Sequence, residues 1–112
     1  MKGIVMTVYV IAEVKVETEE WIPAYASEVW KLVKKHNGKY LSRSGNLTSL
    51  EGSKDLSMIA IVEFDTREDA DNFWDDPEYS KYKESRVNGA KNTFTLIDDT
   101  DVTGQIPYLK SG

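Results

Sequence analysis

The segment Ser57–Phe64 is the most apolar in the chain, and it predicts a β-strand with apolar residues on both faces. Successive side chains of a strand point to opposite sides, which places Ile59 and Ile61 together on one face. The other face holds Met58, Ala60, Val62 and Phe64. A strand with one face in water needs polar residues at alternate positions. This strand therefore has to be covered on both sides, which limits the folds open to the chain.

Alternating residues over Ile4–Val16 predict another long strand, and the pattern then changes to that of a helix. We expect Thr18 to cap this helix, with Glu19 and Glu20 in the first turn, where the helix dipole favours negative charge. Apolar residues at helical spacing predict its buried stripe. They are Ile22, Tyr25, Ala26, Val29, Leu32 and Val33.

Asn37-Gly38 is a helix stop signal, and the residues after it predict a strand in two parts. Lys39–Arg43 forms the first part, and Leu47–Glu51 resumes the strand. The glycine of Ser44-Gly45-Asn46 lies between them and favours a bulge or bend, because glycine weakens a regular strand.

Two helices and a last strand are predicted for the rest of the chain. Thr66–Asp69 is a capping-box start, and Asp76-Pro77 ends that helix. A short helix follows over Glu78–Arg86, Asn88-Gly89 breaks it, and Asn92–Asp98 is the strand. The first of these helices buries Ala70, Phe73 and Trp74.

The predicted order is βαββαβ, which indicates an α+β domain of the ferredoxin-like kind with a four-stranded antiparallel sheet. We take residues 1–98 as one domain and residues 99–112 as an extended C-terminal tail. Helices cover only one face of such a sheet, so we expect a homodimer that pairs through the other face. The alternative is that the tail folds back over this face with Ile106, Tyr108 and Leu109.

Composition limits the partners and the compartment. The net charge is -5, and Glu63–Glu78 holds eight carboxylates against a single base, Arg67, so we expect no nucleic-acid partner. The chain has no cysteine, which excludes disulfides and thiolate chemistry. The longest apolar stretch is about half of the ~20 residues that a membrane-spanning helix needs, and no secretion signal is recognised. We therefore expect a cytoplasmic protein with no membrane contact.

An ordered set of motifs over residues 5–98 resembles the DUF1330 family. The motifs are Lys39–Gly45, Leu50–Gly52, Ile61–Phe64, Asp76–Tyr79 and Arg86. That family belongs to the dimeric α+β barrel superfamily, together with cofactor-free monooxygenases of the antibiotic-biosynthesis type. The resemblance implies the ferredoxin-like fold and the face-to-face dimer, whereas the activity of the family itself is undefined. The chain departs from the family pattern at Ser44, where glycine is usual, at Ser53, where an aromatic residue is common, and in its longer tail.

Arg43 and Arg86 are candidate anchors for an acidic group of a ligand. Arg43 stands at the end of a predicted strand beside a break, and Arg86 stands in a helix-to-strand connection. A guanidinium in such a place can hold a carboxylate through two hydrogen bonds. For Arg43 the alternative is a structural ion pair with Glu51 or Glu63.

His36 is the only histidine, so acid–base catalysis by an imidazole would depend on it. It also lies in the last turn of its predicted helix, where an imidazolium complements the helix dipole. One histidine without cysteine does not supply a zinc or haem site, and Asp98, Asp99 and Asp101 lack the spacing of a calcium loop. We therefore expect no metal and no cofactor.

Trp74, Tyr79 and Tyr82 form a predicted aromatic group, which Tyr9 and Tyr40 approach from the sheet. Aromatic walls with a few polar anchors are typical of a small-molecule pocket, and also of an ordinary core.

Two functions fit these residues. The first is a cofactor-independent oxygenase or isomerase of a small aromatic or acidic metabolite. Arg43 would anchor the substrate, the aromatic group would enclose its ring, and His36 or a tyrosine would move a proton. The second is a non-catalytic homodimer that binds a small molecule or acts as an accessory to a partner.

Overall fold

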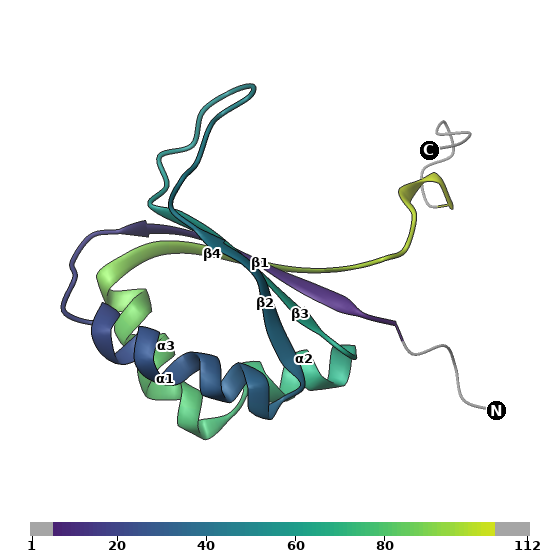
Figure 1. Cartoon of the computed structure of the whole chain (residues 1–112), viewed down its shortest axis with the longest axis horizontal. Helices are drawn as coiled ribbons and strands as arrows, with labels where there is room; N and C mark the ends of the chain where they lie inside the picture. The colour runs from purple at the N-terminus through teal and green to yellow at the C-terminus, as the bar shows by residue number, and fades with distance from the viewer. Residues whose placement is uncertain (1–5, 105–112) are drawn as a thin grey trace.

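The computed structural model describes residues 6–104, which form a four-stranded antiparallel sheet with three helices on one face (Figure 1). The strands are β1 (Val8–Val16), β2 (Gly38–Ser44), β3 (Met58–Phe64) and β4 (Ala90–Asp98). The helices are α1 (Ile22–Lys35), α2 (Arg67–Trp74) and α3 (Pro77–Gly89), and a 3-10 turn follows at Val102–Gly104. The strand order β2-β3-β1-β4 confirms the α+β, ferredoxin-like fold predicted from the sequence.

The start of α1 differs from the prediction. Thr18 does not cap this helix, which begins at Ile22 after Trp21, and no acidic residue lies in the first turn. The backbone N–H groups of Glu17 and Thr18 both donate to the Gly89 carbonyl at 2.9 Å. These bonds hold the β1–α1 connection against the end of α3, so the chain turns into the helix three residues later.

The prediction that the strand resumes after Gly45 is also wrong. Leu47–Glu51 is not a strand, because residues 45–57 form a long loop that projects from the sheet (Figure 1). β3 begins at Met58, opposite the end of β2, and therefore offers no partner to the residues beyond Ser44. The register shift lies earlier than predicted, between Tyr40 and Ser42.

The caps around α2 and α3 are local and follow from sequence. The Thr66 hydroxyl accepts a hydrogen bond from the Asp69 N–H at 3.0 Å, which confirms the predicted start of α2. Asp76 caps α3 in the same way through the Glu78 N–H at 2.8 Å, with Pro77 in the first turn. The helix α3 is longer than predicted, because Asn88-Gly89 remains helical and β4 begins directly at Ala90.

The core lies between the sheet and the helices. Its buried members are Val8, Val29, Val33, Val62, Phe64, Ala70, Phe73 and Tyr79. The predicted inward face of β3 is confirmed, since Ala60, Val62 and Phe64 are all buried.

The other face of the sheet carries an apolar strip. Ile11 of β1 pairs with Ile61 of β3 at its centre, and both side chains are half-buried within the single chain. Ile97 of β4 lies beside Tyr9 and is 47% exposed. The loop 45–57 and the segment after β4 project away from the sheet (Figure 1). Ile106, Tyr108 and Leu109, which could cover this face, lie outside the described residues.

Within residues 6–104, no helix combines the length and the apolar character that crossing a membrane requires.

The Trp21 ring packs against Gly89, and its Nε1 donates to the Gly89 carbonyl at 3.2 Å. An alanine methyl at position 89 would overlap this ring. We therefore expect Gly89→Ala to destabilise the fold by about 1–3 kcal/mol in urea denaturation, although alanine is the better helix former. Asn88→Ala, at the exposed neighbouring position, is the control and should change stability by about 0.5 kcal/mol or less. Equal stability of the two variants would contradict the packing argument.

Candidate functional site

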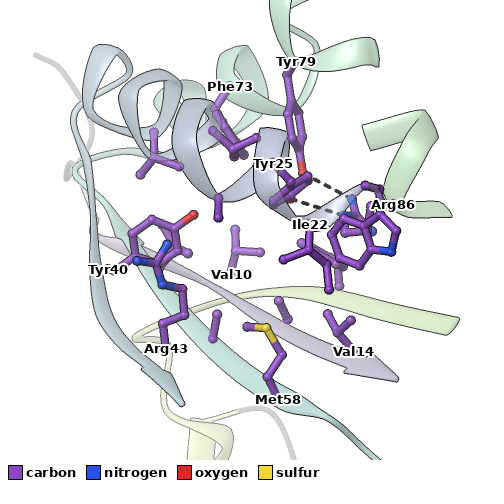
Figure 2. Close-up of a pocket in the computed structure, with 18 of the residues that line it drawn as sticks. Val10, Val14, Ile22, Tyr25, Tyr40, Arg43, Met58, Phe73, Tyr79 and Arg86 are labelled. Carbon is purple, nitrogen blue, oxygen red and sulfur yellow. Dashed lines mark hydrogen bonds between the residues drawn. The ribbon is translucent and has the colours of Figure 1, made fainter. Parts of the chain in front are cut away.

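A cavity of about 310 Å³ lies between the sheet and the helices, with the start of α1 and the end of α3 at one side of it (Figure 2). Apolar side chains from β1, β3 and α1 form most of its wall. The polar groups are few and stand in two places. Tyr25, Tyr79 and Arg86 lie on one side, and Tyr40 and Arg43 lie on the other (Figure 2).

Two alanines make the floor of the cavity. Ala12 of β1 pairs with Ala60 of β3, and the same row of the sheet continues to Phe94 of β4 and to Arg43 of β2. Small side chains at two adjacent central positions leave a hollow, while the larger residues at both ends of the row form its rims. The cross-strand pairing of these four residues therefore produces the cavity.

Arg86 of α3 is buried at one end of the cavity, with only 2% of its surface exposed. Its Nε donates to the Tyr25 hydroxyl and its Nη2 donates to the Tyr79 hydroxyl, each at 3.2 Å. The two hydroxyl oxygens are 2.7 Å apart, so one of them donates to the other. The guanidinium also lies 4.0 Å from the centre of the Phe94 ring, in a cation–π contact.

No carboxylate among the described residues forms an ion pair with Arg86. A guanidinium has five N–H groups and no acceptor, and here only two of them are used. The two tyrosines have two hydroxyl protons and use one between them. This end of the cavity therefore has a surplus of hydrogen-bond donors around one positive charge, which suits a negatively charged oxygen.

Burial raises the pKa of the Tyr25 hydroxyl well above its usual value, and the neighbouring Tyr79 adds to the effect, whereas Arg86 opposes it. Tyr25 consequently stays protonated at neutral pH. In this state its hydroxyl can donate a hydrogen bond and is not a base that removes a proton.

Arg43 and Tyr40 of β2 form the other end of the cavity. The Arg43 guanidinium lies 4.6 Å from the centre of the Tyr40 ring. Residues three apart on a regular strand point to opposite faces, but the register shift between Tyr40 and Ser42 turns both side chains toward the cavity. Burial raises the pKa of Tyr40, and the Arg43 charge opposes that shift.

The alternative role of Arg43, an ion pair with Glu51 or Glu63, is not found within residues 6–104. Glu63 lies on the other face of the sheet and pairs with Lys39 at 3.6 Å. Arg43 is exposed at the cavity edge, so its guanidinium can be reached from solvent.

His36 lies away from the cavity, at the junction of α1 and α3. Its Nε2 is 2.7 Å from Asp76 Oδ2, which also accepts a hydrogen bond from Lys35 at 3.0 Å. The His36 bond, the Glu78 N–H and Lys35 together hold the pKa of the Asp76 carboxyl far below its usual value. This group joins the end of one helix to the start of another.

The remaining predicted site residues are divided between the two faces of the sheet. Trp74 packs on Tyr79 and Phe94 behind the cavity wall, with the Lys83 ammonium 4.4 Å from the centre of its ring. Tyr9 lies on the opposite face, where its hydroxyl donates to Asp99 at 3.4 Å. Of the predicted set, the structure therefore brings together Arg43, Tyr79 and Arg86 around the cavity.

No cluster of three or more histidine, aspartate or glutamate side chains within the described residues has the geometry to hold a metal ion.

The family described as a domain of unknown function, DUF1330, matches residues 7–100. The chain belongs to the DUF1330 family. No curated protein matches the chain.

Solved structures share the fold of this DUF1330 domain. A protein of unknown function from Rhodopseudomonas palustris is 15% identical with a TM-score of 0.71, over 86% of this chain and 84% of that one. SnoaB, a cofactor-independent oxygenase from Streptomyces nogalater, is 11% identical with a TM-score of 0.61, over 86% and 95%. A protein from Mycobacterium tuberculosis is 16% identical with a TM-score of 0.50, over 85% and 96%. At these identities the likeness shows the fold alone.

The helical spacing indicates Tyr25 only as part of the core stripe, and no sequence pattern indicates that the two alanines form a cavity floor. For Tyr25 the signal was its place in a buried stripe, because a buried tyrosine hydroxyl needs a hydrogen-bond partner. No sequence signal was available for Ala12 and Ala60, because only the strand register places them side by side.

The DUF1330 domain should lose stability at acidic pH through Asp76. A carboxyl with a lowered folded-state pKa stabilises the fold above its unfolded pKa of 3.8, and this contribution is lost as the pH falls toward the folded value. Asp76→Asn keeps a helix-capping oxygen but removes the charge. We expect the variant to be less stable than the wild type at pH 7 in urea denaturation, with a difference that shrinks below pH 3.8.

Asp75→Asn, at the exposed neighbouring position, provides the control and should show no comparable pH dependence. A difference between the wild type and Asp76→Asn that is constant from pH 7 to pH 3 would rule out this role of the charge.

Proposed function

We propose that this protein binds a small, mainly apolar molecule with an acidic oxygen in the cavity, and acts on it as a cofactor-independent oxygenase or isomerase. The observation that carries the proposal is Arg86, a buried guanidinium without a carboxylate partner among the described residues, at the wall of an apolar cavity. An unpaired buried charge is costly, and a bound oxyanion would offset that cost.

The same arrangement supports a reaction. Arg86 and one tyrosine hydroxyl would stabilise the anion formed when a phenol or enol of the substrate loses its proton to solvent. The charge of such an anion is shared with a carbon atom. That carbon can take up a proton at a new position, which is isomerisation. It can also react with O₂ to convert a CH₂ group to a carbonyl, with the second oxygen atom leaving as water. Neither route needs a separate reductant.

The fold comparison adds limited support, since one of the structures that share this fold is a cofactor-independent oxygenase. Because identity to that protein is only 11%, the assignment to this chain depends on the cavity and not on the likeness.

A thermal-shift screen with aromatic acids, naphthols and quinones tests ligand binding. We expect stabilisation by compounds with an acidic oxygen, and a loss of affinity of roughly 10- to 100-fold in Arg86→Gln, the size of one charge-assisted hydrogen bond. Oxygen uptake with the bound compounds, measured without added cofactor, then separates an oxygenase from an isomerase.

Arg67→Gln is the matched control, because Arg67 is an exposed arginine that pairs with Asp71 outside the cavity. If Arg86→Gln and Arg67→Gln bind the compounds equally well, Arg86 has no part in the site and the proposal fails.

Binding without catalysis is the second candidate, and the position of His36 favours it. The single histidine is hydrogen-bonded to Asp76 outside the cavity, and no carboxylate lines the cavity. A proton would therefore have to move through a tyrosine or through solvent. Stoichiometric binding with neither oxygen uptake nor exchange of carbon-bound hydrogen for deuterium would favour this second function.

We also propose that two copies pair through the apolar strip on the free face of the sheet. Ile11 and Ile61 form the centre of the strip, and burying them against the same residues of a second copy would remove both sets from water. A second chain would also meet the loop 45–57, which projects on this side (Figure 1).

Light scattering at micromolar concentration tests this pairing. We expect twice the chain mass of 12.7 kDa for the wild type and the single-chain mass for Ile61→Lys. Trp30→Lys is the control, because Trp30 is a large exposed residue on α1 and should leave the mass unchanged. A wild-type protein of single-chain mass would favour cover by the C-terminal tail.

A further inference from the structure

We propose that the ligand is a hydroxyaryl carboxylate held at both ends, with its hydroxyl oxygen at Arg86 and its carboxylate at Arg43. This inference rests on the proposed function, because it takes the cavity as the ligand site.

One row of the sheet crosses the floor of the cavity and joins its two polar ends. Phe94, Ala12, Ala60 and Arg43 follow one another across four neighbouring strands. Strands in a sheet lie about 4.8 Å apart, so the row spans roughly 14 Å between its end backbones. Arg86 sits above Phe94 at one end of the row, and Arg43 lies at the other (Figure 2). The volume of about 310 Å³ is near the low end for ligand sites, which fits one small molecule lying along the row.

The Arg86 end is suited to a single oxygen atom. The Nε and Nη2 atoms of its guanidinium already donate to Tyr25 and Tyr79, so one of the two edges that can bind a carboxylate with two bonds is occupied, and the Nη1–Nη2 edge is left. The spare hydroxyl proton of the tyrosine pair and the remaining guanidinium N–H groups are available to one atom. A phenol can enter this buried place as a neutral group and ionise there, whereas a carboxylate would have to give up its full hydration first.

The Arg43 end is suited to a carboxylate. The side chain is exposed, and no acidic residue among residues 6–104 pairs with it, so its guanidinium can present two parallel N–H groups. A carboxylate bound there keeps part of its hydration, which lowers the cost of binding a charge. Tyr40, stacked beneath the guanidinium, holds it in place over the cavity edge.

Between these ends the wall offers no charged group and no hydrogen-bonding side chain. Val10, Val14, Met58 and Ile22 line this middle part (Figure 2). A flat apolar ring fits such a surface, and a sugar or peptide with polar groups along its length would leave them without partners.

Four related probes test both ends by calorimetry. They are 4-hydroxycinnamate, cinnamate without the hydroxyl, 4-vinylphenol without the carboxylate, and 2-hydroxycinnamate with the hydroxyl on the wrong side of the ring. We expect 4-hydroxycinnamate to bind wild type the most tightly. Removal of the probe's carboxylate, or the substitution Arg43→Gln, should each cost roughly 10- to 100-fold in affinity.

The two losses should not add, because they remove the same contact. Arg43→Gln should therefore bind 4-hydroxycinnamate and 4-vinylphenol about equally. By the same reasoning, Arg86→Gln should bind 4-hydroxycinnamate and cinnamate about equally. Circular dichroism shows whether Arg86→Gln folds. If it does not, Arg86→Lys replaces it in the test, because lysine keeps the buried charge but lacks the planar guanidinium with its several N–H groups.

The inference is overturned if Arg43→Gln weakens the binding of 4-vinylphenol as much as that of 4-hydroxycinnamate. It is also overturned if 2-hydroxycinnamate binds as tightly as 4-hydroxycinnamate.

The variant Ala60→Leu, whose larger side chain would fill the floor of the cavity, distinguishes a failure of this inference from a failure of the proposed function. If none of the four probes binds, but a compound from the thermal-shift screen binds and is excluded by Ala60→Leu, the cavity is the site and the two-ended ligand is wrong. If Ala60→Leu does not weaken the compounds that bind, the cavity is not the site and both proposals fail.

Discussion

Arg86 is a buried guanidinium with no carboxylate partner among residues 6–104, so it depends on the groups around it, and these groups connect three elements. Tyr25 comes from α1, Tyr79 from α3 and Phe94 from β4, and all three contact the same side chain. Hydroxyl dipoles and a ring face replace part of the water that the charge has lost. The same network therefore connects the two helices to the sheet and makes one end of the cavity rich in hydrogen-bond donors.

The cavity itself has a separate origin in the sheet. Two small residues pair at the centre of one row, and a register shift in β2 turns both Tyr40 and Arg43 toward the helices. Without the shift, one of these two side chains would point to the opposite face, where the apolar strip lies. This shift in register therefore completes the polar second end of the cavity.

Prediction from sequence succeeded where the signal is local and failed where two distant segments meet. Thr66 capped its helix as expected, because a cap needs only the N–H three residues later. Thr18 has the same residue type before a helical stripe, yet Gly89, 71 positions further along, binds its backbone and displaces the helix start. Leu47–Glu51 is predicted to resume the strand after the break at Gly45, but no neighbouring strand lies opposite it to pair with.

The sequence by itself determined the order of the elements and the two-sided character of the sheet, because hydrophobic periodicity and caps act over a few residues. Its ordered motifs also indicated the family. It also marked Arg43, Tyr79 and Arg86 as candidates by residue type. Only the tertiary structure decided that these three share one cavity, that Tyr25 joins them and that His36 does not. The reason is that strand register and helix packing depend on contacts between residues far apart in the chain, which no local pattern records.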